Sequence, residues 1–344
     1  MPQDLEFGLD TFGDVTVDDS GNLLPQHQVL RNIVAEAELA DRLGIDFFGV
    51  GEHHRADFAV SAPDVLLAAI AGRTEHIRLG SAVTVLSSDD PVRVFQRFST
   101  LDAISNGRAE VIIGRGSFTE SFPLFGFNLD QYELLFEERL KLFTELLKEK
   151  PVTWQGATRS ALKDQQVYPP TAKGSLRTWV AVGGTPASVV RAADHGLPLM
   201  LAIIGGDPLS FRPLVELYKR TLAKREMKPL PIGVHSPGYV ADTDDQAREE
   251  LFPHFAAMYA KIGRERGWPP LSRASFEQLA APSGALCAGA PETVALKIAN
   301  TVKALGLSRF DMKYSAGTLP HEMMLRSIEL YATKVVPMVR AMLK

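Results

Sequence analysis

Short apolar runs alternate with longer amphipathic segments along nearly the whole chain, and this alternation limits the possible folds more than any other feature. Runs of this length suit buried strands, and the segments between them carry apolar residues at helical spacing. The predicted strands are residues 5–9, 45–50, 77–86, 109–113, 177–182, 199–203, 232–240 and 309–314. Eight such units predict an α/β fold of the (β/α)8 TIM-barrel type, although a doubly wound open sheet shows the same alternation.

Two segments interrupt the alternation. Residues 151–175 are rich in Thr, Gln, Gly, Pro and Lys and contain two short β-like pieces, which suggests a hairpin. Residues 263–291 contain several glycines and prolines and predict a long mobile loop with a short helix inside, a candidate lid. No linker divides the chain, so we predict one domain over residues 1–344, with insertions after strand four and strand seven.

The composition excludes several classes of protein. Of 344 residues, 45% are hydrophobic and 23% charged, and the net charge of −4 argues against binding to nucleic acid or to an anionic membrane. Cys287 is the single cysteine, so an intrachain disulfide is impossible and a reducing compartment is expected. The N-terminus lacks the pattern of a signal peptide, and no apolar run approaches the ~18 residues of a membrane span. We therefore predict a cytoplasmic protein.

Glu52, His53 and His54 follow the second predicted strand directly. In a parallel α/β protein this is the carboxyl end of a strand, where chemistry usually lies. A metal site is disfavoured, because adjacent side chains diverge and no metal-binding spacing is present. Either the histidines are structural, or one of them donates or accepts a proton beside a cofactor ring. No serine, cysteine or lysine stands out as an activated nucleophile.

The fifth predicted strand ends in a pattern that suits a phosphate. Gly183 and Gly184 let a ligand approach the backbone, a helix begins near Pro186, and Thr185 and Ser188 add hydroxyl groups. The alternative is a tight turn with a threonine N-cap.

Arg115 lies between two glycines just past the fourth strand, where its guanidinium can bind phosphate in a bidentate manner or form an ion pair with a nearby carboxylate. Both elements are expected at the same end of the barrel.

Three further stretches have competing interpretations. The predicted helix at residues 63–73 contains seven consecutive apolar residues, which favours a homodimer, with a covering loop as the alternative. Phe118, Phe122, Phe125 and Phe127 either line an apolar substrate pocket or cover the rim of the barrel. Residues 101–108 span a helix end and a strand start, so Asp102 and Arg108 are expected to be structural.

Several motifs, taken together and in order, resemble those of the bacterial luciferase-like flavin-dependent monooxygenases. They are residues 52–54, 81–86 with 91–93, 101–108, 114–116, 183–186, 192–198, 291–292 and the tail from 319 to 337. The resemblance covers nearly the whole chain. It implies a (β/α)8 barrel, usually dimeric, that binds reduced FMN, or in one branch a deazaflavin, at the carboxyl face.

The resemblance also implies roles for individual residues. His53 matches the catalytic histidine near the flavin ring, and Ala82-Val83 matches a non-proline cis peptide on which the ring packs. Arg115 matches the arginine that binds the phosphate. The positions that match cofactor-binding residues are Ala82, Val83, Arg115, Gly183, Gly184, Thr185 and Ser188.

The implied reaction uses reduced FMN from a separate flavin reductase, and dioxygen, to oxidise a small organic substrate through a flavin hydroperoxide. The barrel mouth must exclude water, so that this adduct attacks the substrate before it releases hydrogen peroxide. Two alternatives remain open: a deazaflavin-dependent oxidoreductase that transfers hydride on the same barrel, and a non-catalytic flavin-binding subunit.

Two departures matter. Gly114 replaces the reactive cysteine of luciferase, and Gly184 replaces a glutamate of its phosphate loop. Light emission and the aldehyde substrate are therefore not carried over, and the substrate cannot be read from the sequence.

Overall fold

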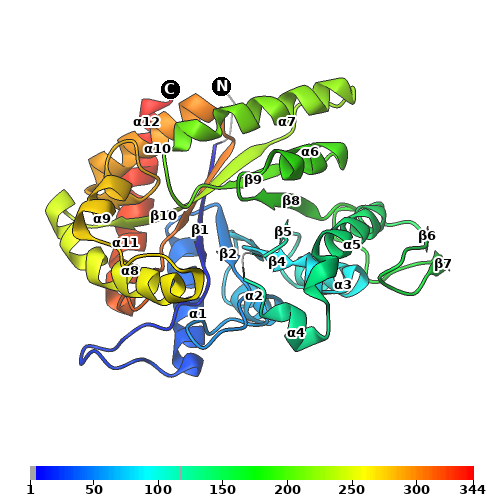
Figure 1. Cartoon of the computed structure of the whole chain (residues 1–344), viewed down its shortest axis with the longest axis horizontal. Coiled ribbons are helices and arrows are strands. Elements are labelled where there is room, and N and C mark those ends of the chain that lie inside the picture. The colour runs from blue at the N-terminus through cyan, green and yellow to red at the C-terminus, as the bar shows by residue number, and fades with distance from the viewer. Residues whose placement is uncertain (1–4, 117) are drawn as a thin grey trace.

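Parallel strands close into a barrel in the computed structural model, which describes residues 5–116 and 118–344 (Figure 1). Within these residues eight strands form the barrel, each pairs with the next, and the last pairs with the first. They are β1 (Glu6–Thr11), β2 (Phe47–Val50), β3 (Arg78–Ser81), β5 (Ala109–Gly114), β8 (Arg177–Val182), β9 (Leu199–Ala202), β10 (Ile232–Val240) and β12 (Arg309–Lys313). The predicted barrel is confirmed, and closure of the sheet rules out the open alternative.

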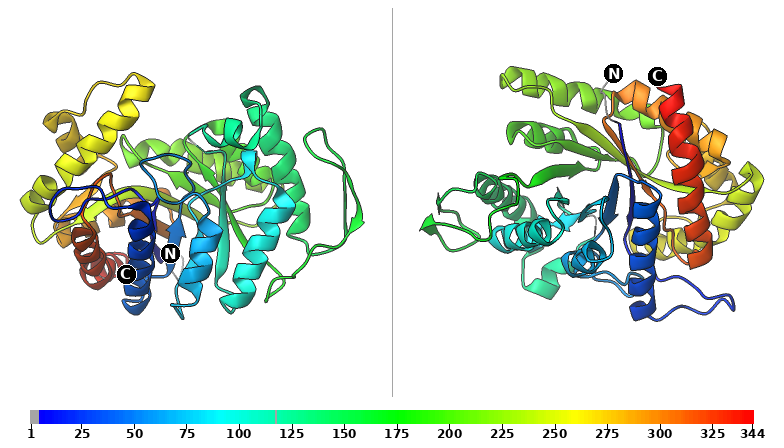
Figure 2. Two further views of the ribbon diagram at one scale, coloured as in Figure 1. Left: turned by 90° about the horizontal axis from the view of Figure 1, so that it is seen from below. Right: turned by 180° about the vertical axis from the view of Figure 1, so that it is seen from behind.

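Helices surround the barrel and bury their apolar faces against it (Figures 1 and 2). They are α1 (Gln26–Arg42), α2 (Pro63–Ala71), α3 (Pro91–Ile104), α4 (Ser121–Phe125), α5 (Tyr132–Leu146), α6 (Pro186–Asp194), α7 (Arg212–Lys224), α8 (Asp244–Arg266), α9 (Arg273–Ala280), α10 (Pro291–Leu305), α11 (His321–Leu330) and α12 (Val336–Met342). A π-helical turn, Tyr331–Val335, joins the last two. No helix in the described part of the chain is long and apolar enough to cross a membrane.

Two local predictions are corrected. The third predicted strand is split at the cis peptide Ala82-Val83 into β3 and the short β4 (Thr84–Val85), which pairs with β5. The spacing of Asp130 and Glu133 also predicts a capping box at the start of α5, but Asn128 instead caps a preceding 3₁₀ turn by accepting from the backbone N–H of Asp130. Glu133 does not cap the helix, because its carboxylate contacts two arginines instead.

The first insertion is the predicted hairpin. Strands β6 (Val152–Trp154) and β7 (Leu162–Gln165) pair in antiparallel fashion and project from the barrel beside α5 (Figures 1 and 2).

The second insertion is more ordered than the sequence indicates. Helix α8 continues to Arg266, α9 follows, and β11 (Cys287–Gly289) pairs with β10. The sequence Cys-Ala-Gly in β11 lacks the β-branched residues that signal a strand. The ammonium of Lys297 donates to the backbone carbonyls of Ala280, Ala281 and Leu286. This buried lysine connects α9, which is the predicted short helix, to β11, the strand that the sequence interpretation missed.

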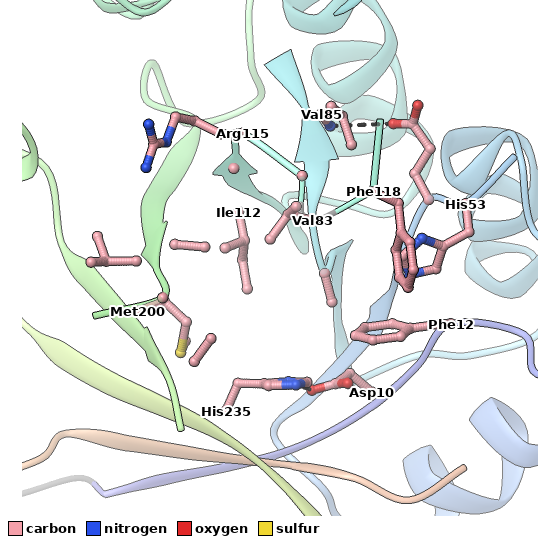
Figure 3. A pocket seen from close by; sticks show the side chains of 18 of the residues that line it. Asp10, Phe12, His53, Val83, Val85, Ile112, Arg115, Phe118, Met200 and His235 are labelled. Atoms are coloured by element: carbon pink, nitrogen blue, oxygen red, sulfur yellow. Dashed lines mark hydrogen bonds and ion pairs between the residues drawn. The ribbon is translucent and has the colours of Figure 1, made fainter. Parts of the chain in front are cut away.

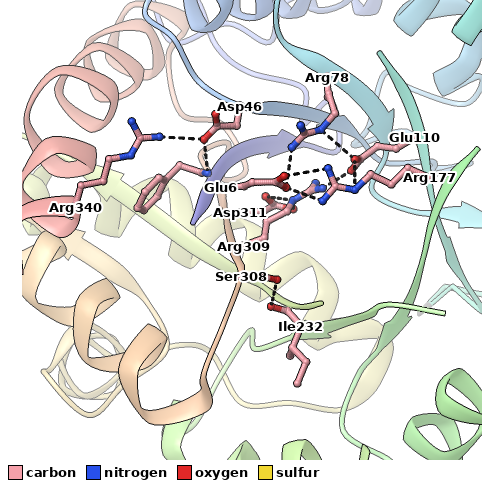
Figure 4. A network of polar contacts seen from close by, with 11 residues as sticks. Glu6, Asp46, Arg78, Glu110, Arg177, Ile232, Ser308, Arg309, Asp311 and Arg340 are labelled. Carbon is pink, nitrogen blue, oxygen red and sulfur yellow. Dashed lines mark hydrogen bonds and ion pairs between the residues drawn. The ribbon is translucent and has the colours of Figure 1, made fainter. Parts of the chain in front are cut away.

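Ion pairs fill the amino end of the barrel (Figure 4). Arg309 is fully buried between Glu110 and Asp311, and its guanidinium carbon lies 3.6 Å from the centre of the Phe47 ring. Burial raises the pKa of the Glu110 carboxyl, but the guanidinium groups of Arg309, Arg177 and Arg78 outweigh burial and keep this pKa below its ordinary value.

The turn at residues 101–108 contributes to the same end. Arg108 donates to the carbonyls of Ala71, Thr74, Ile77 and Ser105, and Asp102 accepts from the Ala172 N–H. The structural interpretation of this turn is confirmed, and the carboxyl end of the barrel is left for chemistry.

Candidate active site

A cavity of about 330 Å³ opens at the carboxyl end of the barrel (Figure 3). Its volume lies within the range of small-molecule sites. Its walls come from distant parts of the chain and fall into three parts: a polar rim beside β5 and β8, a corner around His53, and a floor formed by β1, β10 and β12.

The rim brings together the two predicted phosphate elements. One terminal nitrogen of Arg115, after β5, donates to the Ser188 hydroxyl in the first turn of α6 at 3.3 Å. The Thr185 hydroxyl donates to the same Ser188 oxygen at 2.7 Å. Ser188 and Gly183 line the cavity, whereas Gly184 and Thr185 lie just outside it.

The backbone of the rim leaves room for an anion. A Cβ at Gly183 would meet no atom within 4 Å. Gly184 has a φ of +120°, a conformation that L side chains rarely adopt. Thr185 is the N-cap residue of α6, but its side chain makes no capping hydrogen bond, so the simple N-cap interpretation does not hold. The N–H groups of the first helical turn have no partners within the helix and favour an anion.

Arg115 also forms an ion pair with Glu133, as its alternative interpretation predicts. The Glu133 side chain is 60% exposed, and pairs of this kind are weak. Arg191, on α6, contacts Glu133, Glu137 and the Ser188 hydroxyl, so the rim contains a second guanidinium. The sequence interpretation missed Arg191. Its position three residues after Ser188, on the same helix face, is the signal that could have found it.

The expected non-proline cis peptide is present between Ala82 and Val83, and both residues line the cavity. The Val83 side chain explains one departure from luciferase. A Cβ at Gly114 would lie 2.6 Å from Val83 Cγ2, so a cysteine at this position would require Val83 to move.

His53 lies in an aromatic corner of the cavity, just past β2. Its ring centre is 4.9 Å from that of Phe12, 4.4 Å from that of Phe58 and 5.1 Å from that of Phe118. Within residues 5–116 and 118–344 its imidazole makes no hydrogen bond. Burial lowers the pKa of His53 to about 4, so the imidazole is neutral at pH 7.

The neighbours of His53 belong to the wall. His54 Nε2 lies 2.9 Å from one Glu52 oxygen, and the other accepts from the Val85 N–H at 3.3 Å. Of the four phenylalanines after Arg115, Phe118 lines the cavity and Phe122 is buried, while Phe125 is half exposed with its ring against that of His54. Both interpretations of this aromatic run are thus partly correct. No group of His, Cys, Asp or Glu in the described residues has the geometry to hold a metal.

The floor was missed by the sequence interpretation. Asp10 on β1, His235 on β10 and Asp311 on β12 all line the cavity, and His235 Nδ1 lies 2.7 Å from Asp10 Oδ2. Burial raises the pKa of Asp311 to about 6, against the lowering effect of Arg309. Asp10 and His235 lie in mostly apolar strands, so neither stands out in the sequence. In the sequence, only Arg309, Asp311 and Lys313 give a signal, because their spacing of two places all three on one face of a strand, toward the interior of the barrel.

Curated relatives match this chain over different lengths. The uncharacterised protein y4vJ of Sinorhizobium fredii is 26% identical over 336 residues, which is 91% of this chain and 92% of y4vJ. A second protein of that organism, y4wF, is 30% identical over 57% of this chain and 56% of y4wF. The alkanal monooxygenase alpha chain of Photorhabdus luminescens is 29% identical over 52% of this chain and 49% of its own length. The matched region thus spans about half of two of these relatives.

Solved structures share the fold over almost the full chain. The monooxygenase RslO1 from Streptomyces bottropensis has a TM-score of 0.83 and 24% identity, covering 97% of this chain and 99% of that chain. The oxygenating constituent of 3,6-diketocamphane monooxygenase from Pseudomonas putida, in complex with FMN, has a TM-score of 0.77 and 19% identity, with coverages of 97% and 98%. An F420-dependent secondary alcohol dehydrogenase has a TM-score of 0.76 and 18% identity, with coverages of 98% and 100%.

At these identities the structures establish the fold alone. The family follows from the sequence itself, because residues 7–309 match the model of one family. This chain belongs to the luciferase-like monooxygenase family.

Proposed function

We propose that this chain is an FMN-dependent monooxygenase, which uses reduced FMN from a separate reductase, and dioxygen, to oxidise a small organic substrate. The observation that supports it best is the convergence of Arg115, Ser188 and the start of α6 on one rim of the cavity that His53 also faces. A phosphate-binding rim and a neutral imidazole then lie in one enclosed site.

The residues of the site fit FMN. Arg115, Arg191, Ser188 and the first N–H groups of α6 would hold the phosphate by charge and hydrogen bonds. Val83 and Ile112 offer apolar surface of the kind a flat ring packs on. When bound, reduced FMN would supply the activation of dioxygen.

His53 would hold or accept a proton at a ring nitrogen in the cavity, since its imidazole is neutral at pH 7. Phe12, Phe58 and Phe118 around it exclude water from this corner, which protects reactive species from hydrolysis.

Binding of FMN to Arg115→Ala tests this proposal. A lost charged hydrogen bond costs about 1.5–3 kcal/mol, so we expect FMN affinity to fall roughly ten- to a hundredfold. Titration calorimetry measures the affinity. Arg340→Ala is the matched control, because Arg340 is half exposed and pairs with Asp46 at the amino end of the barrel. Equal FMN affinity in wild type and Arg115→Ala would remove Arg115 from the phosphate site.

A deazaflavin-dependent oxidoreductase is the second candidate, because an F420-dependent enzyme shares this fold. The two candidates differ in their use of oxygen. Parallel titrations with FMN and F420, followed by oxygen-consumption measurements with the reduced cofactors, separate them. Tight F420 binding without oxygen consumption would favour hydride transfer.

We also infer a homodimer through α2. Leu66, Leu67 and Ile70 pack on the barrel, whereas Val65 is 67% exposed, so no loop within the described residues covers that outer face. Val65 borders a groove between α2 and α3 that also contains Ile104, which is 54% exposed. An exposed apolar strip on two adjacent helices suits a two-fold interface. Sedimentation of wild type and Val65→Asp checks this inference: the variant should be monomeric, and a wild-type monomer would contradict it.

A further inference from the structure

Asp10 and His235 form a pair on the side of the cavity away from the phosphate-binding rim (Figure 3). In the order of pairing around the barrel, β8 and the rim lie four strands from β1, which contributes Asp10. His235 comes from the middle of β10, next to β12. The proposed function assigns no role to either residue.

The geometry of the pair fixes which nitrogen is available. Asp10 is 1% exposed, and His235 Nδ1 donates to its Oδ2 at 2.7 Å. The Phe12 ring stacks on the imidazole, with centres 5.8 Å apart and planes 12° from parallel. Among the described residues, Asp10 is the one hydrogen-bond partner of the His235 side chain. The second ring nitrogen, Nε2, is therefore free for a molecule in the cavity.

The groups that face His235 set its charge. Burial lowers its pKa, but the charge and hydrogen bond of Asp10, helped by the charge of Asp311, raise the pKa above its ordinary value. Lys313 acts in the opposite direction, but its ammonium is bound to Asp14 at 3.0 Å. Asp10 thus favours the form of His235 in which both ring nitrogens carry a proton and Nε2 can donate.

We propose that His235, oriented by its hydrogen bond to Asp10, donates a hydrogen bond from Nε2 to the carbonyl oxygen of a neutral organic substrate. This inference deepens the proposed function and rests on it for the reaction. A carbonyl oxygen accepts a hydrogen bond and brings no charge of its own. A carboxylate substrate would add an uncompensated anion beside Asp10 and Asp311 in a buried site, which is costly. The charged donor draws electron density from the carbonyl carbon and makes it more electrophilic.

The test uses cyclohexanone as the probe and methylenecyclohexane, which replaces the oxygen by CH₂, as its control. In the protein labelled with ¹⁵N-histidine, we expect cyclohexanone to shift the Nε2 resonance of His235, and methylenecyclohexane to leave it in place. Asp10→Asn keeps the shape of the site but removes the charge, and should weaken cyclohexanone binding about tenfold or more at pH 7. His235→Gln should weaken it to a similar extent. Asp18→Asn, in an exposed turn, is the matched control.

The pH dependence has a definite sign. Neutral His235 keeps its Nδ1 proton on Asp10 and has no donor at Nε2, so cyclohexanone binding should fall as the pH rises through the elevated pKa of His235. Stronger binding at higher pH, or equal Nε2 shifts with both probes, would overturn the inference.

FMN affinity separates the remaining outcomes. If His235→Gln binds FMN at least tenfold more weakly and cyclohexanone as the wild type does, the pair serves the cofactor ring, and the inference is wrong. If the wild type binds no FMN and does not oxidise reduced FMN while the cyclohexanone results hold, the proposed function fails and the carbonyl subsite stands. Retained FMN affinity in the variants also shows that the barrel is folded.

Discussion

His53 and His235 face the same cavity but have opposite surroundings. His53 is surrounded by Phe12, Phe58 and Phe118 and titrates at a pKa of about 4, whereas the Asp10 carboxylate raises the pKa of His235. Burial disfavours the charged form of both rings, and only a carboxylate at hydrogen-bond distance reverses the result. One small site thus contains two imidazoles whose pKa values are shifted in opposite directions, which is how a single fold separates a proton acceptor from a proton donor.

The largest expected effect concerns the neutral histidine. His53→Ala should slow the oxygen-dependent oxidation of bound reduced FMN by roughly 10²-fold or more, the usual scale of a lost general acid–base group. Stopped-flow absorbance and peroxide release measure it. His76→Ala, whose side chain is 81% exposed, is the control. Unchanged oxidation and peroxide formation would favour a non-catalytic flavin-binding protein.

The free energy of unfolding below pH 7 tests the low pKa of His53. The pKa of His53 is about 4 in the folded chain and about 6.5 when unfolded, so the unfolded state binds more protons between these values. The contribution of His53 to the free energy of unfolding is complete above pH 6.5 and lost as the pH falls through 4, about 3 kcal/mol in all. In urea unfolding, His53→Phe should lose less stability than wild type between pH 7 and pH 4. Equal losses of stability in wild type and His53→Phe would contradict the low pKa of His53.

The contribution of His235 to the free energy of unfolding should depend on pH in the opposite sense. Because its folded pKa is raised, its stabilisation is fully present below pH 6.5 and lost as the pH rises through the folded value. Asp10→Asn removes a charged hydrogen bond and should lower the free energy of unfolding by about 1.5–3 kcal/mol at pH 6, and by less at pH 9. Asp19→Asn, at an exposed position, should show no such difference. A larger loss of stability in Asp10→Asn at pH 9 than at pH 6 would contradict a raised pKa of His235.

The smallest effect is expected at the mouth. Arg55 binds Asp57, Glu120 and Glu265, and so connects the end of α8 to the loops around His53. Its charge also lowers the pKa of His53, so Arg55→Gln should raise this pKa toward its ordinary value. The loss in stability should stay below about 1 kcal/mol, since two of the three carboxylates are a third or more exposed. Histidine NMR titration follows the shift, and an unmoved pKa would exclude this charge effect.

The contrast also shows what the sequence could reveal. The rim was predictable from its glycines. Glycines stand on both sides of Arg115, and Gly183 and Gly184 follow another strand, and both patterns indicate a turn at the end of a strand. His53 was predictable because a polar cluster directly follows an apolar strand. The barrel itself follows from periodicity.

The floor could not be found in the same way. Asp10 and His235 are 225 positions apart, and whether a strand residue faces the interior depends on a register that only barrel closure sets. The contact between them, and so the raised pKa of His235, exists only in the folded chain. Strand β11 was missed for a related reason: its backbone pairing with β10 stabilises three residues without strand propensity of their own.

The ion pairs that fill the amino end determine from which side molecules can enter and leave the cavity. Arg309 and Glu110 are fully buried there, so the barrel offers a visiting molecule no passage from that side. In the proposed reaction, substrate, product and dioxygen would share the opening at the carboxyl end with a cofactor whose phosphate is held by Arg115. The order in which these molecules arrive and depart is therefore constrained by the architecture of the barrel, before any individual affinity is considered.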